Sequence, residues 1–314
     1  MKRGCVRASV LALRRCTLIS GAMLMLAGMS ACQIAGKRPT DTGTREAEPC
    51  EPERARERVA VAHVGSTYDQ LVLSLGPVLF LPLEGSSATE PDMSGHNHTA
   101  TFLPADGAPN MVAMPNGDLA PSFNGQDQYV EVPSSSVLSV THTGCLTVQA
   151  WIRPATLQFP HEEGTGYVYI LGKGAPSEYE YAIRMYSAAN TEVPVRPNRI
   201  SGYVFNLAGG WGSGAYFQDP VDVNQWIMVT MVIDDRRSEK WPDGYVALYK
   251  DAVMRDQVSL AQYDVKPHAG DAPFCIATRD NDSYFEGAIG KVAVYDKVLS
   301  GSAIAELYNN MNAG

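Results

Sequence analysis

Residues 225–235 read QWIMVTMVIDD and residues 244–253 read GYVALYKDAV, and a polar segment with a proline separates the two apolar runs. Short apolar runs of this kind, bounded by turn-forming residues, are typical of β-strands. Similar runs recur from Gly76 onward, among them CLTVQAWIRP at 145–154 and EYAIRMYS at 180–187. Ten or more such strands with no helices between them exclude a doubly wound α/β fold. They predict an all-β, two-sheet sandwich of the jelly-roll type.

Two short helices are expected at the periphery of this sandwich. Residues 66–74 (STYDQLVLS) begin with a serine, which is a good helix N-cap, and residues 302–310 (SAIAELYNN) place apolar side chains at helical spacing. Trp151 and Trp226 lie within alternating apolar runs, so we expect both to be core residues rather than sugar-binding platforms.

Seven stretches occur in an order that resembles the bacterial laminin G-like domain, a concanavalin A-like lectin/glucanase domain. They are YDQLVL with GPVLFLPLE (68–84), PDMSGHNHTATF (91–102), FNGQDQYVEVP (123–133), LTVQAWIRP (146–154), NQWIMVTMVID (224–234), GYVALYKDAV (244–253) and FEGAIGKVAVYDKVLSGSAIAELY (285–308). The resemblance implies one concanavalin A-like jelly-roll domain over residues 65–314. Lectins, adhesion modules and enzymes all use this fold, so the resemblance alone does not determine the function.

The N-terminal segment predicts export. Basic residues lead into the apolar run LISGAMLMLAGM at 18–29, which is shorter than the roughly 20 residues needed to cross a bilayer and is typical of a signal peptide. The run ends Met29-Ser30-Ala31-Cys32, which resembles a bacterial lipobox. We therefore expect a signal peptide over 1–31, lipidation of Cys32 and a lipoprotein of the bacterial cell envelope. An ordinary secreted protein is the alternative, and Arg14-Arg15 leaves export by the twin-arginine route open.

Charge patterning restricts the partners. Residues 32–64 mix acids, bases and prolines without an apolar period, so we expect a disordered, charged tether. The whole chain has a net charge of -9, and five of its bases but none of its acids lie in residues 1–31. An acidic mature chain excludes nucleic acid as the expected partner and argues against electrostatic docking on anionic lipid. Membrane contact is therefore expected through the lipid anchor only.

The cysteines fit an exported protein. Cys145 and Cys275 both open strand-like runs, and in an oxidising compartment they are expected to form a disulfide. Two separately buried thiols are the alternative, and Cys50 is left without an assigned role. No Cys-x-x-Cys pair or histidine at ligand spacing indicates a zinc site.

The sequence indicates a non-catalytic domain. Laminarinase-type relatives carry Glu-x-Asp-x-x-Glu on one strand, so the resemblance would place a nucleophile and an acid there, but this sequence has no such motif. The nearest pair, Glu178 and Glu180, lacks the central aspartate. No nucleophile elbow or partnered histidine replaces it.

The resemblance also implies a possible calcium site. Family members commonly use the aspartate of a C-terminal Ile-Asp pair, which reads Ile289-Gly290 here. The remaining candidate oxygen ligands are Asp92, Asp280, Asp282 and Glu286.

Aromatic side chains in the central strands are the candidate ligand contacts. They are Tyr179, Tyr181, Tyr203, Trp211 and Tyr216, and Trp211 stands out because glycines surround it. Exposed aromatic faces beside polar groups suit sugar recognition. We therefore expect a surface-tethered, carbohydrate-binding module. A structural or protein-interaction module of the cell envelope is the alternative, and a glycoside hydrolase is the least favoured.

Overall fold

The computed structural model describes residues 65–85, 88–105, 107, 109–206 and 211–313. The chain divides into two units, Met1–Ala60 and Val61–Gly314, and every described residue lies in the second. The expected signal peptide, Cys32 and the 32–64 tether lie outside the described residues. Within the described ranges, no helix is long and apolar enough to span a membrane.

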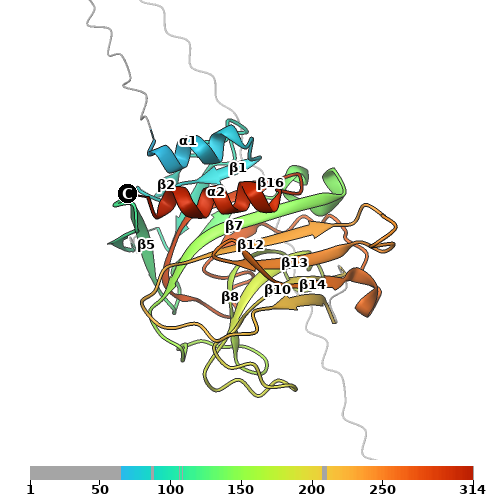
Figure 1. Ribbon diagram of the computed structural model, residues 1–314. Coiled ribbons are helices and arrows are strands. Elements are labelled where there is room, and N and C mark those ends of the chain that lie inside the picture. Colours follow the sequence, from blue (N-terminus) through green and yellow to red (C-terminus); the bar gives the residue numbers. More distant parts are fainter. Residues whose placement is uncertain (1–64, 86–87, 106, 108, 207–210, 314) are drawn as a thin grey trace, which may run out of the picture. The chain divides into compact units, whose positions relative to one another are not determined.

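The described residues form sixteen strands, arranged in two antiparallel sheets (Figure 1). The strands of sheet A are β1 (Leu79–Leu81), β4 (Asn110–Ala113), β5 (Leu119–Asn124), β7 (Cys145–Pro154), β12 (Ile227–Asp234), β13 (Tyr245–Lys250), β14 (Val253–Ser259) and β16 (Glu286–Tyr295). Their spatial order is β14-β13-β12-β7-β16-β5-β4, and β1 pairs with β16.

Sheet B has its own set of strands, which are β2 (Thr89–Glu90), β3 (Ala100–Leu103), β6 (Tyr129–Val132), β8 (Tyr167–Lys173), β9 (Tyr181–Tyr186), β10 (Ile200–Val204), β11 (Ser213–Tyr216) and β15 (Phe274–Ile276). They are arranged in the order β11-β10-β9-β8-β15-β6-β3-β2. Short 3-10 turns at Ser136–Leu138, Val140–His142 and Leu260–Tyr263 lie in the connections. The predicted all-β, two-sheet sandwich is confirmed.

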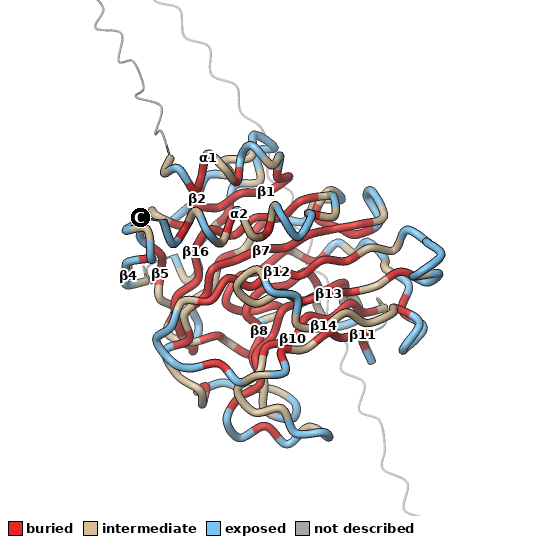
Figure 2. Tube along the Cα trace, viewed as in Figure 1, coloured by how far each residue is buried: buried red, intermediate tan, exposed pale blue. Residues whose placement is uncertain are grey.

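The main core lies between the sheets because side chains alternate along each strand. Val148 and Ile152 on β7 and Ile183 and Met185 on β9 belong to one buried cluster. Figure 2 shows the strands largely buried and many of the connections exposed. Trp151 has the opposite orientation to Val148 and Ile152, so it lies on the outer face of sheet A.

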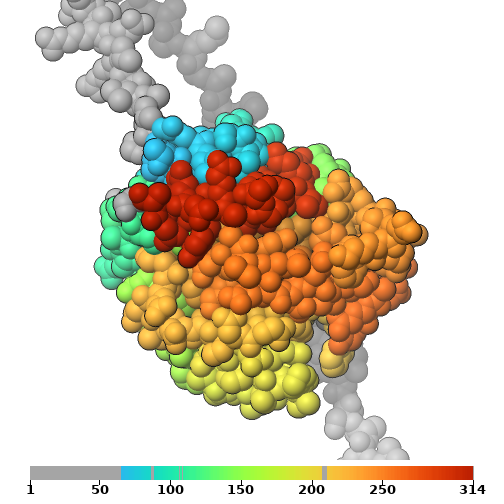
Figure 3. All heavy atoms as spheres, viewed as in Figure 1, coloured from blue at the N-terminus to red at the C-terminus, as the bar shows by residue number. Residues whose placement is uncertain are grey.

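Both predicted helices pack on that outer face. They are α1 (Thr67–Ser74) and α2 (Gly301–Met311), and they lie next to each other on the surface (Figure 3). The Ser66 hydroxyl caps α1 by accepting from Asp69 N, as its sequence position predicts. Trp151 donates its indole N–H to the Tyr68 hydroxyl at 3.0 Å and stacks on Tyr308. Trp151 is 1% exposed, which confirms it as a core residue.

The expected disulfide is wrong: Cys145 and Cys275 are both buried, free thiols. Their neighbours Leu146, Phe274 and Ile276 point into the core between the sheets. Because side chains alternate, Cys145 points outward from sheet A and Cys275 outward from sheet B. The two thiols therefore lie on opposite sides of the sandwich. Burial raises the pKa of Cys275 to about 12, so that thiol stays protonated.

Candidate functional site

The outer face of sheet B carries a cluster of aromatic and arginine side chains, while α1 and α2 both pack on sheet A. A hollow of about 390 Å³ opens in this cluster, and we call it the Trp211 hollow. Side chains from the four strands β8 to β11 and from the loops beside them line it, including Tyr167, Arg184, Arg196, Tyr203, Trp211 and Tyr216.

Two glycines make room for the aromatic rings of this cluster. Tyr203 on β10 is paired with Gly214 on β11, and a Cβ at Gly214 would lie 2.5 Å from the Tyr203 ring. A Cβ at Gly212 would lie 2.7 Å from the Phe205 ring. No side chain can occupy these positions without moving the rings. Gly212 and Gly214 therefore leave room for the rings of Phe205 and Tyr203 close to the backbone of this segment.

Arg184 occupies the centre of the cluster. Its guanidinium carbon lies 4.1 Å from the ring centroid of Tyr167 and 4.0 Å from that of Tyr203, so both rings flank the cation. Arg184 Nη2 donates to the Tyr186 hydroxyl at 2.7 Å. Cation–π contacts of this kind stabilise a partly desolvated arginine.

Three tyrosine hydroxyls form a hydrogen-bonded chain beside Arg184. The hydroxyl oxygens of Tyr186 and Tyr203 are 2.7 Å apart, and those of Tyr203 and Tyr216 are 2.5 Å apart. Burial raises the pKa of Tyr203 and of Tyr216, so these hydroxyls keep their protons at neutral pH. Each of them can therefore donate one hydrogen bond.

The rim of the hollow is exposed and aromatic. Trp211 is 76% exposed, and its ring lies 5.6 Å from that of Tyr263 with an angle of 30° between the planes. On the other side the Arg196 guanidinium lies 3.9 Å above the Tyr216 ring. An indole that is open to solvent beside fixed polar groups is an arrangement that can stack against a sugar ring.

The structure brings together three of the five aromatic residues singled out in the sequence: Tyr203, Trp211 and Tyr216. Tyr179 lies beside the hollow, where its ring covers the Arg279 guanidinium at 4.0 Å. Tyr181 must be removed from the set, since it is fully buried in the core and its hydroxyl donates to Leu138 O.

The Glu178 and Glu180 pair is used in structural contacts. Glu180 is buried and forms an ion pair with the buried Lys173. Its Oε1 also accepts from Gly270 N at 2.9 Å, and Glu178 Oε2 accepts from Asp271 N at 3.2 Å. These contacts tie β8 and β9 to the segment that precedes β15.

The candidate calcium ligands separate into two groups. Asp92 is committed to a turn, because its carboxylate accepts from the backbone N–H groups of Phe80, Ser94 and His98. Glu286 joins no cluster of three acidic groups within the described ranges. Neither residue fits a calcium site.

Asp280 and Asp282 do come together, with Glu163 as a third carboxylate that the sequence analysis missed. Their ligand oxygens all lie within 4.8 Å of one another. Asp280 Oδ2 pairs with Arg279, whereas the buried Asp280 Oδ1 has no hydrogen-bond partner. Burial, with Asp280 close by, raises the pKa of Glu163 to about 7. This set of hard oxygen donors, with one buried oxygen unused, fits Ca²⁺.

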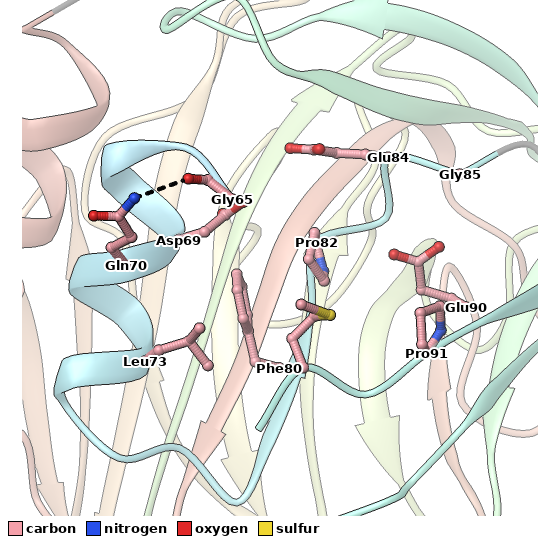
Figure 4. A pocket seen from close by; sticks show the side chains of 11 residues that line it. Gly65, Asp69, Gln70, Leu73, Phe80, Pro82, Glu84, Gly85, Glu90 and Pro91 are labelled. Atoms are coloured by element: carbon pink, nitrogen blue, oxygen red, sulfur yellow. Dashed lines mark hydrogen bonds between the residues drawn. The ribbon is translucent and has the colours of Figure 1, made fainter. Parts of the chain in front are cut away.

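A second hollow, of about 360 Å³, lies between α1 and β1 (Figure 4). Leu73 and Phe80 belong to its apolar wall, and the carboxylates of Asp69, Glu84 and Glu90 also line it. Burial raises the pKa of Glu90, whose Oε1 accepts from Leu83 N at 2.9 Å.

A lysine ammonium already lies among the acids at this second hollow. Lys291 follows the Ile289-Gly290 pair directly, and its fully buried side chain places Nζ 2.7 Å from Asp69 and 2.8 Å from Asp118. Lys291 also forms an ion pair with Glu84. Burial alone would lower the pKa of Lys291, but the hydrogen bonds to the three carboxylates raise it, so the ammonium stays charged. The lysine ammonium thus offsets part of the negative charge of three carboxylates whose oxygens lie within 4.8 Å of one another.

Comparison with known proteins gives one family. The concanavalin A-like lectin/glucanases superfamily matches residues 124–305, which is more than half of the chain. No curated protein matches the sequence.

Among the solved structures with a similar fold are binding domains of Paraclostridial Mosquitocidal Protein 1 and of botulinum neurotoxins. The binding domain of Paraclostridial Mosquitocidal Protein 1 is 13% identical with a TM-score of 0.55, over 76% of this chain and 52% of that domain. The ligand-binding domain of botulinum neurotoxin serotype D, solved with N-acetylneuraminic acid, is 13% identical with a TM-score of 0.54 over the same shares. The binding domain of botulinum neurotoxin DC, solved with rat synaptotagmin II, is 14% identical with a TM-score of 0.53. This chain spans about half the length of these domains, and at such identities the similarity shows the fold alone.

Proposed function

Because the chain belongs to the concanavalin A-like lectin/glucanases superfamily, we propose that it is a non-catalytic binding module that takes a glycan in the Trp211 hollow. The observation that carries this proposal is the 76% exposed indole of Trp211 at the rim of a hollow with arginine and tyrosine donors. Sugar sites combine an aromatic face with a few fixed polar groups, and this hollow offers both.

The comparisons support a binding role in a general way. The toxin domains of the same fold were solved with a sialic acid in one case and with a receptor protein in another. The carboxylates that the sequence offers as a catalytic pair, Glu178 and Glu180, are engaged in ion-pair and backbone contacts. Retaining hydrolysis needs two carboxyl groups about 5–5.5 Å apart beside the substrate, and these two groups do not line the Trp211 hollow.

A glycan array tests the proposal. The Val61–Gly314 unit, which has its own core, is applied with Ca²⁺ and with a chelator. Trp211→Ala should weaken binding about tenfold or more, because aromatic anchors dominate binding energies. Its stability should change by less than about 0.5 kcal/mol, as is usual for exposed positions.

Trp241→Ala is the matched control, because Trp241 is only partly buried and lies outside the hollow, between β12 and β13. We expect this variant to keep wild-type glycan binding. A Trp211→Ala variant that unfolds several degrees early would identify Trp211 as a packing residue and remove the site.

A protein partner is the second candidate function. Val193 is 91% exposed and Val195 is 60% exposed, and both lie in the loop that carries Arg196 beside the hollow. An apolar rim of this kind suits contact with another protein. A photo-reactive cross-linker at position 193, used in intact cells, should then form adducts with a defined envelope protein. If the domain binds glycans on the array but forms no such adduct, the protein-partner function is contradicted and only the glycan proposal stands.

We also infer that Ca²⁺ binds among Glu163, Asp280 and Asp282. The unpartnered Oδ1 of Asp280 supports this site. Ca²⁺ should raise the Tm of the wild-type unit and of the exposed-carboxylate control Asp271→Asn, but not that of Asp282→Asn. An unchanged wild-type Tm in millimolar Ca²⁺ would contradict this site.

We propose finally that a lipid on Cys32 holds the binding module at the cell envelope of a bacterium. The lipobox-like sequence Met29–Cys32 supports this arrangement. A lipid anchor needs no apolar helix in the folded unit.

A further inference from the structure

The hydroxyl chain beside Arg184 has a direction. A guanidinium only donates hydrogen bonds, so the Tyr186 oxygen accepts from Arg184. Tyr186 is fully buried, and among the described residues the only other partner of its hydroxyl is Tyr203. Tyr186 must therefore donate to Tyr203, since a buried proton without an acceptor is costly. Tyr203 then donates to Tyr216, and the Tyr216 proton remains for a group in the hollow.

The other polar groups that line the hollow are also mainly donors. Arg196 is partly exposed there, and Arg184, at 7% exposure, has a buried Nε with no hydrogen-bond partner. Two cations and a directed hydroxyl thus converge on one space. A ligand group that only accepts hydrogen bonds would match them.

One carboxylate of the protein already lies between the two arginines. Glu192 Oε2 is 3.4 Å from Arg184 Nη2, and Glu192 Oε1 is 3.3 Å from Arg196 Nη1. Charge-assisted hydrogen bonds are usually about 2.7–2.9 Å long, so both contacts are loose. Thr165 donates to the same carboxylate at 3.2 Å. The space between the two arginines therefore accommodates a carboxylate, and that of Glu192 is only weakly held there.

We propose that the Trp211 hollow selects an acidic sugar, whose carboxylate replaces that of Glu192 between Arg184 and Arg196 while the sugar ring stacks on Trp211. This inference rests on the proposed glycan-binding function and names the class of glycan. A planar carboxylate matches the guanidinium fork in two hydrogen bonds, which a neutral hydroxyl cannot do. The chain as a whole is acidic, with net charge -9, so a short oligosaccharide is favoured over a long polyanion.

The test compares two forms of each probe. Short oligosaccharides that contain galacturonate, glucuronate or N-acetylneuraminate are arrayed as free acids and as methyl esters, beside neutral oligosaccharides. The free acids should bind about tenfold or more tightly than their esters, since a charged hydrogen-bond pair is worth well over the 1.4 kcal/mol of one decade.

Three variants assign the effect to the arginine pair. Arg196→Gln should weaken binding of the acids about tenfold and leave the esters unchanged. Glu192→Gln should strengthen binding of the acids several-fold, because the competing carboxylate is gone. Arg236→Gln is the control, since Arg236 is an exposed arginine that pairs with Asp234 outside the hollow.

The outcomes separate this inference from the proposed function. Equal binding of acids and esters, or an equal loss of both in Arg196→Gln, would overturn the acidic-sugar inference and leave glycan binding intact. Absence of binding to every acidic and neutral probe would overturn the proposed function as well. Arg184 is buried and its replacement could disturb folding, so the assignment depends on Arg196 and Glu192.

Discussion

Replacement of Lys291 by methionine should destabilise the domain strongly. Methionine keeps much of the length and apolar stem of lysine but removes the ammonium that Asp69, Glu84 and Asp118 share. A buried ion pair that loses one partner typically costs about 3–5 kcal/mol, because the other charge stays desolvated. The Glu84 and Asp118 side chains are 26% and 18% exposed, so water screens part of the charge that is left. We therefore expect the lower end of the range, about 3 kcal/mol.

Urea unfolding at neutral pH measures this loss. Burial alone would raise the pKa of Asp118, but hydrogen bonds with Lys291, Asn116 and Ser66, of which the one with Lys291 is the strongest, together lower it. A depressed carboxyl pKa stabilises the fold above the ordinary value near 3.8, and this contribution is lost as the pH falls through the folded pKa. The difference between wild type and Lys291→Met should therefore shrink in acid.

Calcium provides the second readout. In Lys291→Ala the space of the ammonium is open, and three carboxylate oxygens within 4.8 Å remain around it. Calcium–oxygen distances of about 2.3–2.6 Å fit that spacing. Ca²⁺ should therefore restore stability to Lys291→Ala but not to Lys291→Met, whose side chain fills the space. Free Ca²⁺ at 100 times its Kd would contribute about 2.7 kcal/mol.

Lys250→Met is the control, because Lys250 pairs with the half-exposed Asp219 at the surface and should cost less than about 1 kcal/mol. A Lys291→Met variant within about 1 kcal/mol of wild type would refute the reasoning. The carboxylates would then have to be protonated or hydrated without the lysine.

Three further predictions address other parts of the chain. The pKa of the buried Glu90 is raised, so the folded state binds its proton more tightly than the unfolded state does, and ionisation of this acid lowers stability as the pH rises above about 4.5. The stability of Glu90→Gln relative to wild type should therefore increase from pH 4 to pH 7. An equal difference between the two proteins at both pH values would contradict the assignment. Because Cys145 and Cys275 are free, a reducing agent should leave the Tm of the Val61–Gly314 unit unchanged, whereas a lowered Tm would indicate a disulfide. Cys32→Ala should move the full chain from the membrane fraction to the soluble fraction, and retention in the membrane would show another anchor.

The strands and the two helices could be predicted because their signals are local. Alternation along residues 145–154 and the Ser66 cap each depend on a few neighbouring residues. The same alternation also signals that Tyr181 is buried, because it shares a face with Ile183 and Met185. The lone Arg184 between those two apolar residues is the corresponding signal for an outward-facing site.

The rest of the site depends on pairing between distant segments. Glu163 approaches Asp280 and Asp282 across more than 100 residues, and no spacing in the sequence encodes that approach. The disulfide prediction was wrong for the same reason, since two cysteines that open strands give no information on which sheet each strand joins. Sheet order must be known before outward-facing side chains can be assigned to one site.

One outer face of the sandwich is covered by helices and the other is open. Sheet A is covered by α1 and α2, which means that the described chain begins and ends on that side, whereas the Trp211 hollow is open on sheet B. Both ends of the described chain therefore lie on the face opposite the Trp211 hollow. Neither end crosses the face that the proposed ligand would approach, so the binding face and the attachment points of the chain are separated by the thickness of the sandwich.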